Sequence, residues 1–434
     1  MTHDSGHVIR NFEALATTPA RSALLSIAEA GYRAIATDEV VRGAVQLAGN
    51  ELTVLGATYN LAEYENIYVL GVGKCSIDAA EELEAILGDR ISRGVVLDVR
   101  STETLKRIGV LQGTHPFPSA DNAAHTQRLL ELAESAGPRD LVLGIISGGG
   151  STLLCQPETH TCADEAVLIK HLFKTGATIH ELNTVRKHLS KARGGHIAAA
   201  VHPATLVTLI FSDVPGDDIH TIASAPTVLD ESTLADARAV FDKYHTDSRA
   251  FSAEHLFETP KDARLFETTT NGLAVTNKTA LEAMKKAAEE LSYTAEVCDT
   301  RLEGEAREVA AMLADKLHEA PARSVFLYGG ETTVTINGPG QGGRNEELAL
   351  AALSQLHDDE LVTSIASDGR DNTDFAGGIA DHHTLSQAQL RGLNPEDYLF
   401  TNDSFSFFHT LQQGINTGYT GSNVADLVIA VKHG

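Results

Sequence analysis

The sequence predicts an α/β protein built from two Rossmann-like, three-layer domains with mostly parallel sheets and an active-site cleft between the domains. Three observations support this prediction. The chain has 434 residues, which is too long for one ordinary hydrophobic core. Apolar runs of strand length alternate with amphipathic helical stretches almost throughout. Several of these apolar runs lead directly into glycine-rich loops, as strands of an open parallel sheet do at a ligand site.

The first series of elements extends to about residue 244. We expect strands at 67–70, 94–99, 141–146 and 206–212, and helices at 76–87, 163–177, 179–200 and 233–244. The stretch from residue 250 to 270 is polar and irregular, which is typical of a domain boundary. We therefore expect an N-terminal domain at residues 1–255 and a C-terminal domain at residues 256–434.

The second series begins just after this boundary. We expect strands at 273–276, 293–298, 325–328, 361–366 and 427–431, and helices at 278–291 and 305–318. Between these elements the chain again carries loops rich in glycine and carboxylates. The second half thus repeats the layout of the first, in which strands lead into such loops.

Composition and charge exclude several classes of protein. The formal net charge of −25 disfavours nucleic acid and anionic membranes as partners. No apolar run approaches the ~18 residues that a membrane span requires, and residues 1–10 do not read as a signal peptide, so we expect a cytoplasmic protein. The four cysteines (75, 155, 162 and 298) contain no C-x-x-C pair, so we expect buried or idle thiols and neither a disulfide nor a zinc site.

Four loops of the first half suit an anionic ligand. GVGK (residues 71–74) and SGGGS (residues 147–151) let the backbone approach a phosphate, and Lys74 adds a mobile cation. The stretch 183–196 contains Arg186, Lys187 and two further basic residues without an acid, which is unusual in so acidic a chain. SDVPGDD (residues 212–218) places three carboxylates after a strand; they could hold Mg²⁺ through water, supply a general base or cap a turn.

Loops of the second half have a related composition. GGETT (residues 329–333) and GPGQGGRN (residues 338–345) follow one strand, and Arg344 opens a helix. SDGRDNTD (residues 367–374) brings more carboxylates to a strand end. Lysine and arginine opposite carboxylates and glycine loops are typical of phosphoryl transfer, which depends on positioning and charge neutralisation. A cleft between two domains would exclude the water that otherwise hydrolyses ATP.

Taken together, these loops resemble the class II glycerate 2-kinase family, whose C-terminal half contains the MOFRL domain, here at about residues 322–430. The segments that carry the resemblance cover residues 67–428 in the family's order: GVGK, THPFPSAD, SGGGSTLL, ELNTVRKHLSKARGGHIA, SDVPGDDIHTIASAPTVLD, LEGEAR, GGETTVTINGPGQGGRNEELALAAL, SDGRDNTDFAGG, NDSFSFF and TGYTGSNVADL. The resemblance implies an ATP-dependent kinase that phosphorylates D-glycerate at its 2-hydroxyl to give 2-phospho-D-glycerate and ADP, with Mg²⁺ or another divalent cation.

The resemblance also implies the site residues. Lys74, Asp213 and Arg344 match the positions expected to be catalytic, and a metal would lie at Asp213 and Asp217. Further residues are expected to bind substrate or nucleotide: Gly73, Ser147, Gly148, Gly149, Gly150, Ser151, Asn183, Arg186, Lys187, Glu331, Thr332 and Asp368. Small molecules are the expected partners, with a homodimer left open.

Three departures from the family pattern concern loops. Ala225 stands in IASAPT where the family commonly has glycine, a glycine is missing in SDGRDNTDFAGG, and the acid of HPFPSAD arrives later, at Asp121. These departures leave open a kinase for another small hydroxy acid or sugar acid, and a non-catalytic anion sensor. A hydroxypyruvate reductase is disfavoured, because the chain has no G-x-G-x-x-G dinucleotide fingerprint.

Overall fold

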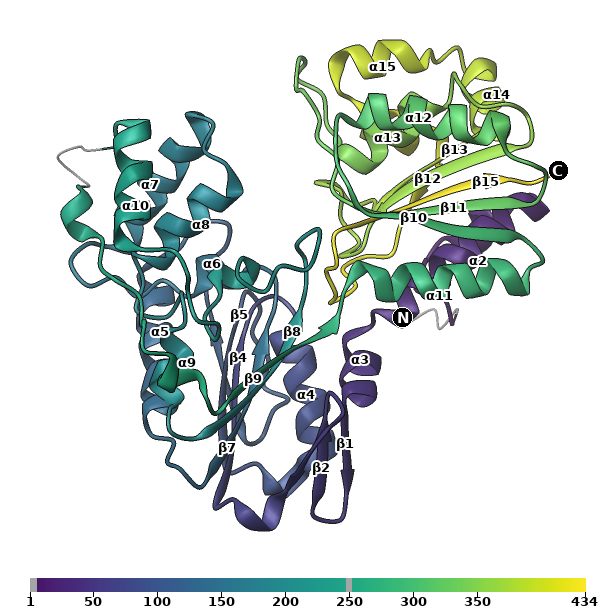
Figure 1. Cartoon of the computed structure of the whole chain (residues 1–434). Helices are drawn as coiled ribbons and strands as arrows, with labels where there is room; N and C mark the ends of the chain where they lie inside the picture. The colour runs from purple at the N-terminus through teal and green to yellow at the C-terminus, as the bar shows by residue number, and fades with distance from the viewer. Residues whose placement is uncertain (1–5, 247–251) are drawn as a thin grey trace. The chain divides into compact units, whose positions relative to one another are not determined.

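The computed structural model describes residues 6–246 and 252–434, which form two compact units (Figure 1). The N-terminal unit comprises residues 37–213 and 217–274, and the C-terminal unit comprises the rest, including the described residues before Thr37. This division differs from the boundary expected at 255/256. Residues 250 and 251 of the expected boundary segment lie outside the described residues.

The N-terminal unit is built on a six-stranded sheet with the order β6-β5-β4-β7-β8-β9. The pairs from β6 to β8 are all parallel, as expected. Every residue of β7 is buried, which agrees with its uninterrupted apolar run, because strands covered on both faces lack polar alternation. The strands are β4 (Asn66–Val72), β5 (Arg93–Asp98), β6 (Ile108–Gln112), β7 (Asp140–Ile146), β8 (Thr205–Phe211) and β9 (Thr269–Val275).

Helices cover both faces of this sheet. Figure 1 shows α4 on one face and α5 and α9 on the other. A small antiparallel sheet of β1 (Val45–Ala48), β2 (Glu51–Val54) and β3 (Ala57–Asn60) adjoins α3 and α4. The helices are α3 (Thr37–Ala44), α4 (Ser76–Leu87), α5 (Ala120–Glu134), α6 (Gly150–Leu153), α7 (Cys162–Lys174), α8 (Ile179–Lys187), α9 (His196–Val201) and α10 (Leu234–Tyr244).

The single helix expected at 179–200 is wrong, because α8 ends at Lys187 and α9 begins only at His196. Gly194 and Gly195 both have positive φ, at 55° and 86°, and this left-handed backbone cannot continue a right-handed helix. The loop between the two helices is held in place instead by the Ser190 hydroxyl, which donates to the Leu154 carbonyl at 2.6 Å.

The C-terminal unit contains a second six-stranded sheet with the order β10-β11-β15-β12-β13-β14. Only β10 and β11 pair in parallel, and the other neighbours are antiparallel, so the expectation of a mostly parallel sheet is wrong for this unit. The reason is that the last strand, β15, inserts between β11 and β12 and runs opposite to both. The strands are β10 (Thr294–Leu302), β11 (Ser324–Gly330), β12 (Glu360–Ala366), β13 (Gly377–Asp381), β14 (Gly414–Ile415) and β15 (Asp426–Lys432).

Helices also cover both faces of the second sheet. Figure 1 shows α2 and α11 on one face and α12 and α13 on the other. The helices are α1 (Phe12–Leu15), α2 (Pro19–Ala34), α11 (Asn277–Glu290), α12 (Ala306–Glu319), α13 (Arg344–Ala352), α14 (His382–Leu390), α15 (Pro395–Thr401) and α16 (Ser404–Leu411). Helix α2 is fixed to this unit by the fully buried Arg21, which donates to both carboxylate oxygens of Asp381 at 2.6 and 2.7 Å.

These contacts explain the unexpected division of the chain. The segment containing α2 precedes the N-terminal unit in sequence but packs against α11, which comes much later. Strand β9, which the sequence suggested as the start of the second series, forms the edge of the first sheet beside β8. Neither pairing leaves a local signal in the sequence, because each joins elements that are far apart along the chain.

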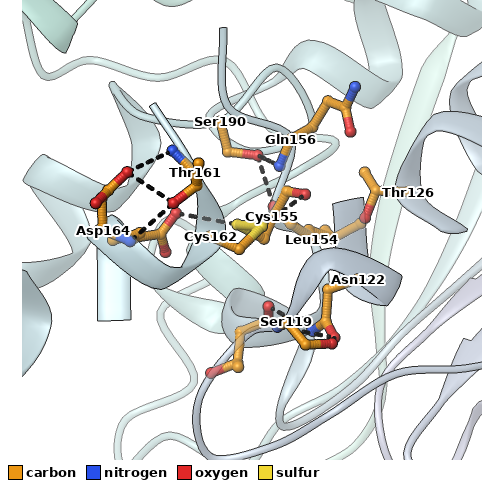
Figure 2. The surroundings of a disulfide bond; sticks show 12 residues. Ser119, Asn122, Thr126, Leu154, Cys155, Gln156, Thr161, Cys162, Asp164 and Ser190 are labelled. Atoms are coloured by element: carbon orange, nitrogen blue, oxygen red, sulfur yellow. Dashed lines mark hydrogen bonds between the residues drawn. A yellow bond between two sulfur atoms is a disulfide. The ribbon is translucent and has the colours of Figure 1, made fainter. Parts of the chain in front are cut away.

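A disulfide bond joins Cys155 and Cys162, so the expectation of idle thiols is wrong for these two residues (Figure 2). The bond links the segment after α6 to the first residue of α7. Beside it the Gln156 amide donates to the Ser190 hydroxyl at 3.0 Å. The remaining two cysteines are free thiols: Cys75 is buried and Cys298 partly buried. Burial raises the pKa of Cys75 to about 12, so this thiol stays protonated.

Candidate functional site

Three neighbouring strands of the N-terminal unit end side by side. Strands β4, β7 and β8 are parallel, so their carboxyl ends lie at one edge of the sheet. Gly73 and Lys74 of GVGK follow β4, SGGGS follows β7, and Ser212 and Asp213 follow β8. Three of the loops selected from the sequence are therefore brought together by the order of the strands.

The loops after β4 and β7 are hydrogen-bonded to each other through their backbones. The Lys74 amide donates to the Gly148 carbonyl at 2.9 Å, and the Ser147 amide donates to the Val72 carbonyl at 3.0 Å. Gly73 has a φ of +118°, and a Cβ added there would collide with Ser147. This close approach requires a glycine at position 73.

The side chains of Lys74 and Asp213 lie against adjacent residues of the SGGGS loop. A Cβ on Gly148 would collide with the Asp213 carboxylate, and a Cβ on Gly149 would lie 3.2 Å from Cγ of Lys74. Burial raises the pKa of Asp213, while the positive charge of Lys74 acts to lower it. An ammonium group and a carboxylate are thus held on neighbouring glycines at the carboxyl edge of the sheet.

Arg186, near the end of α8, adds a second cation to this region. Burial lowers its pKa to about 10, so the guanidinium is still charged at neutral pH. Its Nε has no hydrogen-bond partner within the part of the chain that the structure describes. Partial burial and the charges of Lys74 and Arg186 lower the pKa of His115 to about 4. His115 therefore belongs to the same cluster, although we did not select it from the segment THPFPSAD.

The other basic residues of the 183–196 stretch have carboxylate partners. Lys187 contacts Asp230 at 2.7 Å, Lys191 contacts Glu158 at 2.7 Å, and Arg193 contacts Glu165 at 2.9 Å. Lys187, which we expected to bind substrate, is therefore committed to a buried ion pair. The basic stretch thus contains two different kinds of cation: Arg186, which is partly buried, has no carboxylate in ion-pair distance among the described residues, whereas the others do.

Ser151, the last residue of the SGGGS loop, is connected to Asn183 of α8. Their side chains are linked through Ser224, whose hydroxyl lies 2.8 Å from the Ser151 hydroxyl and donates to the Asn183 amide oxygen at 3.0 Å. Gly150 approaches Ala223 of the same segment. These contacts connect the loop after β7 to α8 and to the IASAPT segment.

In the C-terminal unit, Arg344 is the first residue of α13 and is held by two carboxylates. Its Nη1 lies 2.6 Å from Glu331, and its Nε lies 2.5 Å from Asp426. Burial alone would lower the pKa of Arg344, but the hydrogen-bonded carboxylate of Asp426 raises it above the ordinary value. Asp426 lies in the TGYTGSNVADL segment, and we did not select it from the sequence.

A cavity of about 330 Å³ adjoins Arg344 and is lined in part by Thr332, Gly343 and Asn402. The Thr332 hydroxyl is buried and has no hydrogen-bond partner within the described ranges. Asp368 lies beyond the carboxyl end of β12, where it accepts a hydrogen bond from the Arg370 amide at 3.0 Å. Glu331, Thr332, Arg344 and Asp368 are therefore all at the loop edge of the second sheet.

The start of α13 is fixed by Asp371, another residue that we did not select from the sequence. Its carboxylate accepts from the Glu346 amide at 2.8 Å and from the Asn345 side chain at 3.1 Å. Burial raises the pKa of Asp371 to about 6, and burial with the charge of Asp371 raises the pKa of Glu346 to about 9. Asp371 is the second aspartate of SDGRDNTD, so its place in this motif is the feature of the sequence that could have indicated it.

The two aspartates that we expected to bind Mg²⁺, Asp213 and Asp217, do not form a complete metal site by themselves. Among the described residues, Asp213 and Asp217 do not belong to a group of three neighbouring ligands. Mg²⁺ in kinases is usually held by one or two carboxylates and by substrate phosphates. Asp213, beside Lys74 at a strand end, fits such a role as a single carboxylate.

Comparisons with known proteins show which families and relatives this chain resembles. Residues 23–257 match the family described as "Domain of unknown function (DUF4147)", and residues 324–426 match the MOFRL family. A D-glycerate 2-kinase of Thermotoga maritima is 37% identical over 85% of this chain and 91% of its own. A relative from Agrobacterium vitis, provisionally named a hydroxypyruvate reductase, is also 37% identical, over 83% of this chain and 85% of its own.

The fold is shared as well. The crystal structure of a glycerate kinase from Thermotoga maritima superimposes with a TM-score of 0.84 and 33% identity, over 94% of this chain and 98% of that one. No helix among the described residues is both long and apolar enough to cross a membrane. With both family matches in order along the chain, and relatives of this similarity covering most of it, the chain belongs to the glycerate 2-kinase family with a C-terminal MOFRL domain.

Proposed function

We propose that the protein transfers the γ-phosphoryl group of ATP to the 2-hydroxyl of D-glycerate, giving 2-phospho-D-glycerate and ADP. The observation that carries this proposal is the placement of Lys74 and Asp213 on adjacent glycines of the SGGGS loop. Phosphoryl transfer needs a cation for the developing charge and a group that orients the attacking hydroxyl. Membership of the glycerate 2-kinase family supports glycerate as the acceptor.

Asp213 is the residue we assign to the acceptor hydroxyl. Its burial raises its pKa and thereby makes it a better proton acceptor than an exposed aspartate, while Lys74 keeps the carboxylate form accessible. It would accept the hydrogen bond of the 2-hydroxyl and take its proton as the oxygen attacks phosphorus. Lys74 would then balance charge on the transferring group.

Arg186 is the residue we assign to the glycerate carboxylate. Arg186 is partly buried and its Nε is buried without a hydrogen-bond partner among the described residues, which is costly unless a ligand supplies one. A planar guanidinium also matches a carboxylate with two parallel hydrogen bonds. The pairing of Lys187 with Asp230 supports Arg186 over Lys187 for this role.

Arg344 is the residue we assign to the phosphates of ATP, with Thr332 offering its unpartnered hydroxyl nearby. Arg344 has a fixed orientation because Glu331 and Asp426 hold it from two directions. When Mg²⁺ is bound with ATP it would neutralise phosphate charge, and Asp213 is the carboxylate that could contact it.

The direct test is the ³¹P NMR spectrum of the product formed from ATP and D-glycerate. We expect the resonance of 2-phosphoglycerate; a 3-phosphoglycerate resonance would contradict the assigned regiochemistry. Lys74→Ala should lower kcat by about 10³-fold or more, because one charge-stabilising group in phosphoryl transfer contributes on that order. Lys191→Ala, which removes a half-exposed lysine of the neighbouring basic stretch, should leave kcat unchanged.

The competing functions give distinct results in the same samples. ADP release with a longer sugar acid but not with glycerate would identify a different kinase. Loss of absorbance at the nicotinamide band with hydroxypyruvate would identify a reductase. No transfer with any hydroxy acid would indicate a binding protein, and near-normal turnover in Lys74→Ala would overturn the role of that lysine.

A further inference from the structure

Two histidines and a buried glutamate meet at the edge of the second sheet that is remote from Arg344. His318 lies near the end of α12, His357 lies in the segment before β12, and Glu360 is the first residue of β12. We propose that these three side chains bind a divalent transition-metal ion of the Zn²⁺ class. This site is separate from the proposed function.

The distances between the three groups suit a zinc site. His318 Nε2 lies 3.2 Å from one carboxylate oxygen of Glu360, and His357 Nδ1 lies 3.5 Å from the other. One ligand atom from each residue lies within 4.8 Å of the others. Zinc bonds of about 2.0–2.1 Å in a tetrahedron place neighbouring ligand atoms about 3.3 Å apart. Two of the three separations are thus already close to those of a bound ion.

The chemistry of the donors selects the class of metal. Imidazole nitrogen with one carboxylate is a donor set for zinc, copper, nickel and iron, whereas Mg²⁺ and Ca²⁺ prefer oxygen alone. Three protein ligands leave a fourth position of the tetrahedron for water. The imidazole rings are stacked with centroids 3.9 Å apart, and both rings are at least partly exposed, so an ion can enter from solvent.

Glu360 is also held in place by groups other than the two imidazole rings. It is fully buried, it accepts a hydrogen bond from the His357 amide at 2.8 Å, and Lys432 Nζ lies 2.7 Å from its Oε1. The amide contact orients the carboxylate, as outer contacts do for metal ligands. Lys432 has the opposite effect on affinity, because its positive charge competes with a cation for the same oxygen.

The position of the site makes it independent of catalysis. Glu360 begins β12, while Asp368 lies just beyond the other end of that strand, and the strand between them is about 20 Å long at the ordinary rise. A bound ion would join α12 to the segment before β12 and to β12 itself. Because the ion binds the folded chain, it would stabilise the C-terminal unit.

Zinc chloride titrated into the full chain without nucleotide, followed by calorimetry, tests this proposal. We expect one high-affinity ion per chain, with affinity reduced about tenfold or more in His318→Ala and in His357→Ala. His382→Ala is the matched control, since His382 is an exposed histidine paired with a single aspartate, Asp358, at 2.9 Å. It should bind zinc like the unchanged protein.

Lys432→Gln provides an independent readout. Removal of the competing ammonium should tighten zinc binding several-fold, and added zinc should raise the melting temperature more than in the unchanged chain. Wild-type affinity in both His318→Ala and His357→Ala, or no zinc binding by the unchanged chain at ~100 µM metal, would overturn the proposal. So would a Lys432→Gln variant that binds zinc more weakly.

Discussion

Arg186 in the N-terminal unit and Arg344 in the C-terminal unit both lie beside glycine-rich loops, yet their electrostatic surroundings are opposite. Arg344 is held by Glu331 and Asp426, whereas no carboxylate lies in ion-pair distance of Arg186 among the described residues. A guanidinium with two carboxylates is held in a fixed orientation. A partly buried guanidinium without a carboxylate costs stability, and its charge stays available for a ligand. The two units thus use the same side chain for different purposes.

Arg186→Met is the variant for which we expect the largest effect. We expect kcat/KM for glycerate to fall about 100-fold, mostly through KM, because a charge-assisted pair with the substrate carboxylate is lost. Stability should stay equal or rise, because methionine fills the space without a buried charge. Steady-state kinetics over a range of glycerate concentrations and urea unfolding measure the two effects. An unchanged KM with lower stability would make Arg186 a structural residue.

Arg344→Met is the contrasting variant. It removes the guanidinium that Glu331 and Asp426 both contact, so stability should fall, by about 1–2 kcal/mol once the partial exposure of the pair is allowed for. Turnover should be lost as well. We therefore expect Arg344→Met to lower the free energy of unfolding and Arg186→Met to leave it equal or raise it. If both variants lowered it, the two arginines would not differ in the way that their surroundings suggest.

The sequence predicted the N-terminal cluster better than the C-terminal one, and the reason lies in the sheets. Lys74, Ser147 and Asp213 each follow a parallel strand, so their strand-and-loop pattern alone indicates a shared edge. Asp426 begins β15, whose insertion between β11 and β12 depends on long-range pairing. Its contact with Arg344 therefore has no local signal.

The sequence also does not show which side chains form ion pairs or a disulfide with each other. In the sequence, the basic residues around Arg186 cannot be told apart. The positions of Asp230, Glu158 and Glu165 in the fold decide which of them form ion pairs. The disulfide between Cys155 and Cys162 depends on how α6 and α7 meet rather than on a recognisable spacing. Loops at the ends of parallel strands are thus predictable, whereas the pairing of charges within them requires the fold.

Glu346→Gln tests how the stability of the helix that Arg344 opens depends on pH. The folded pKa of Glu346 is raised from 4.5 to about 9, so the folded state holds a proton that the unfolded state releases. Its contribution to stability is full below about pH 4.5 and is lost as the pH rises to about 9. The slope is at most about 1.4 kcal/mol per pH unit for one proton.

Glutamine imitates the protonated acid, so the variant should lose this slope and be the more stable protein at pH 8. Urea unfolding at several values between pH 6 and 8.5 measures the effect. Asp371, whose pKa is raised to about 6, contributes in the same direction only at the acid end of this range. Parallel stability curves for the two proteins would show that Glu346 does not titrate in this window.

Glu331→Gln is the mildest change, because it makes Arg344 more like Arg186 by removing one of two carboxylates. The Glu331 side chain is 44% exposed and that of Asp426 only 4%, so solvent screens the first pair far more than the second. We expect Glu331→Gln to lower stability by less than about 1 kcal/mol. Asp426→Asn, measured alongside by urea unfolding, should cost clearly more, since the buried partner holds Arg344 at the start of α13. The reverse order would mean that the exposed carboxylate, and not the buried one, fixes the guanidinium.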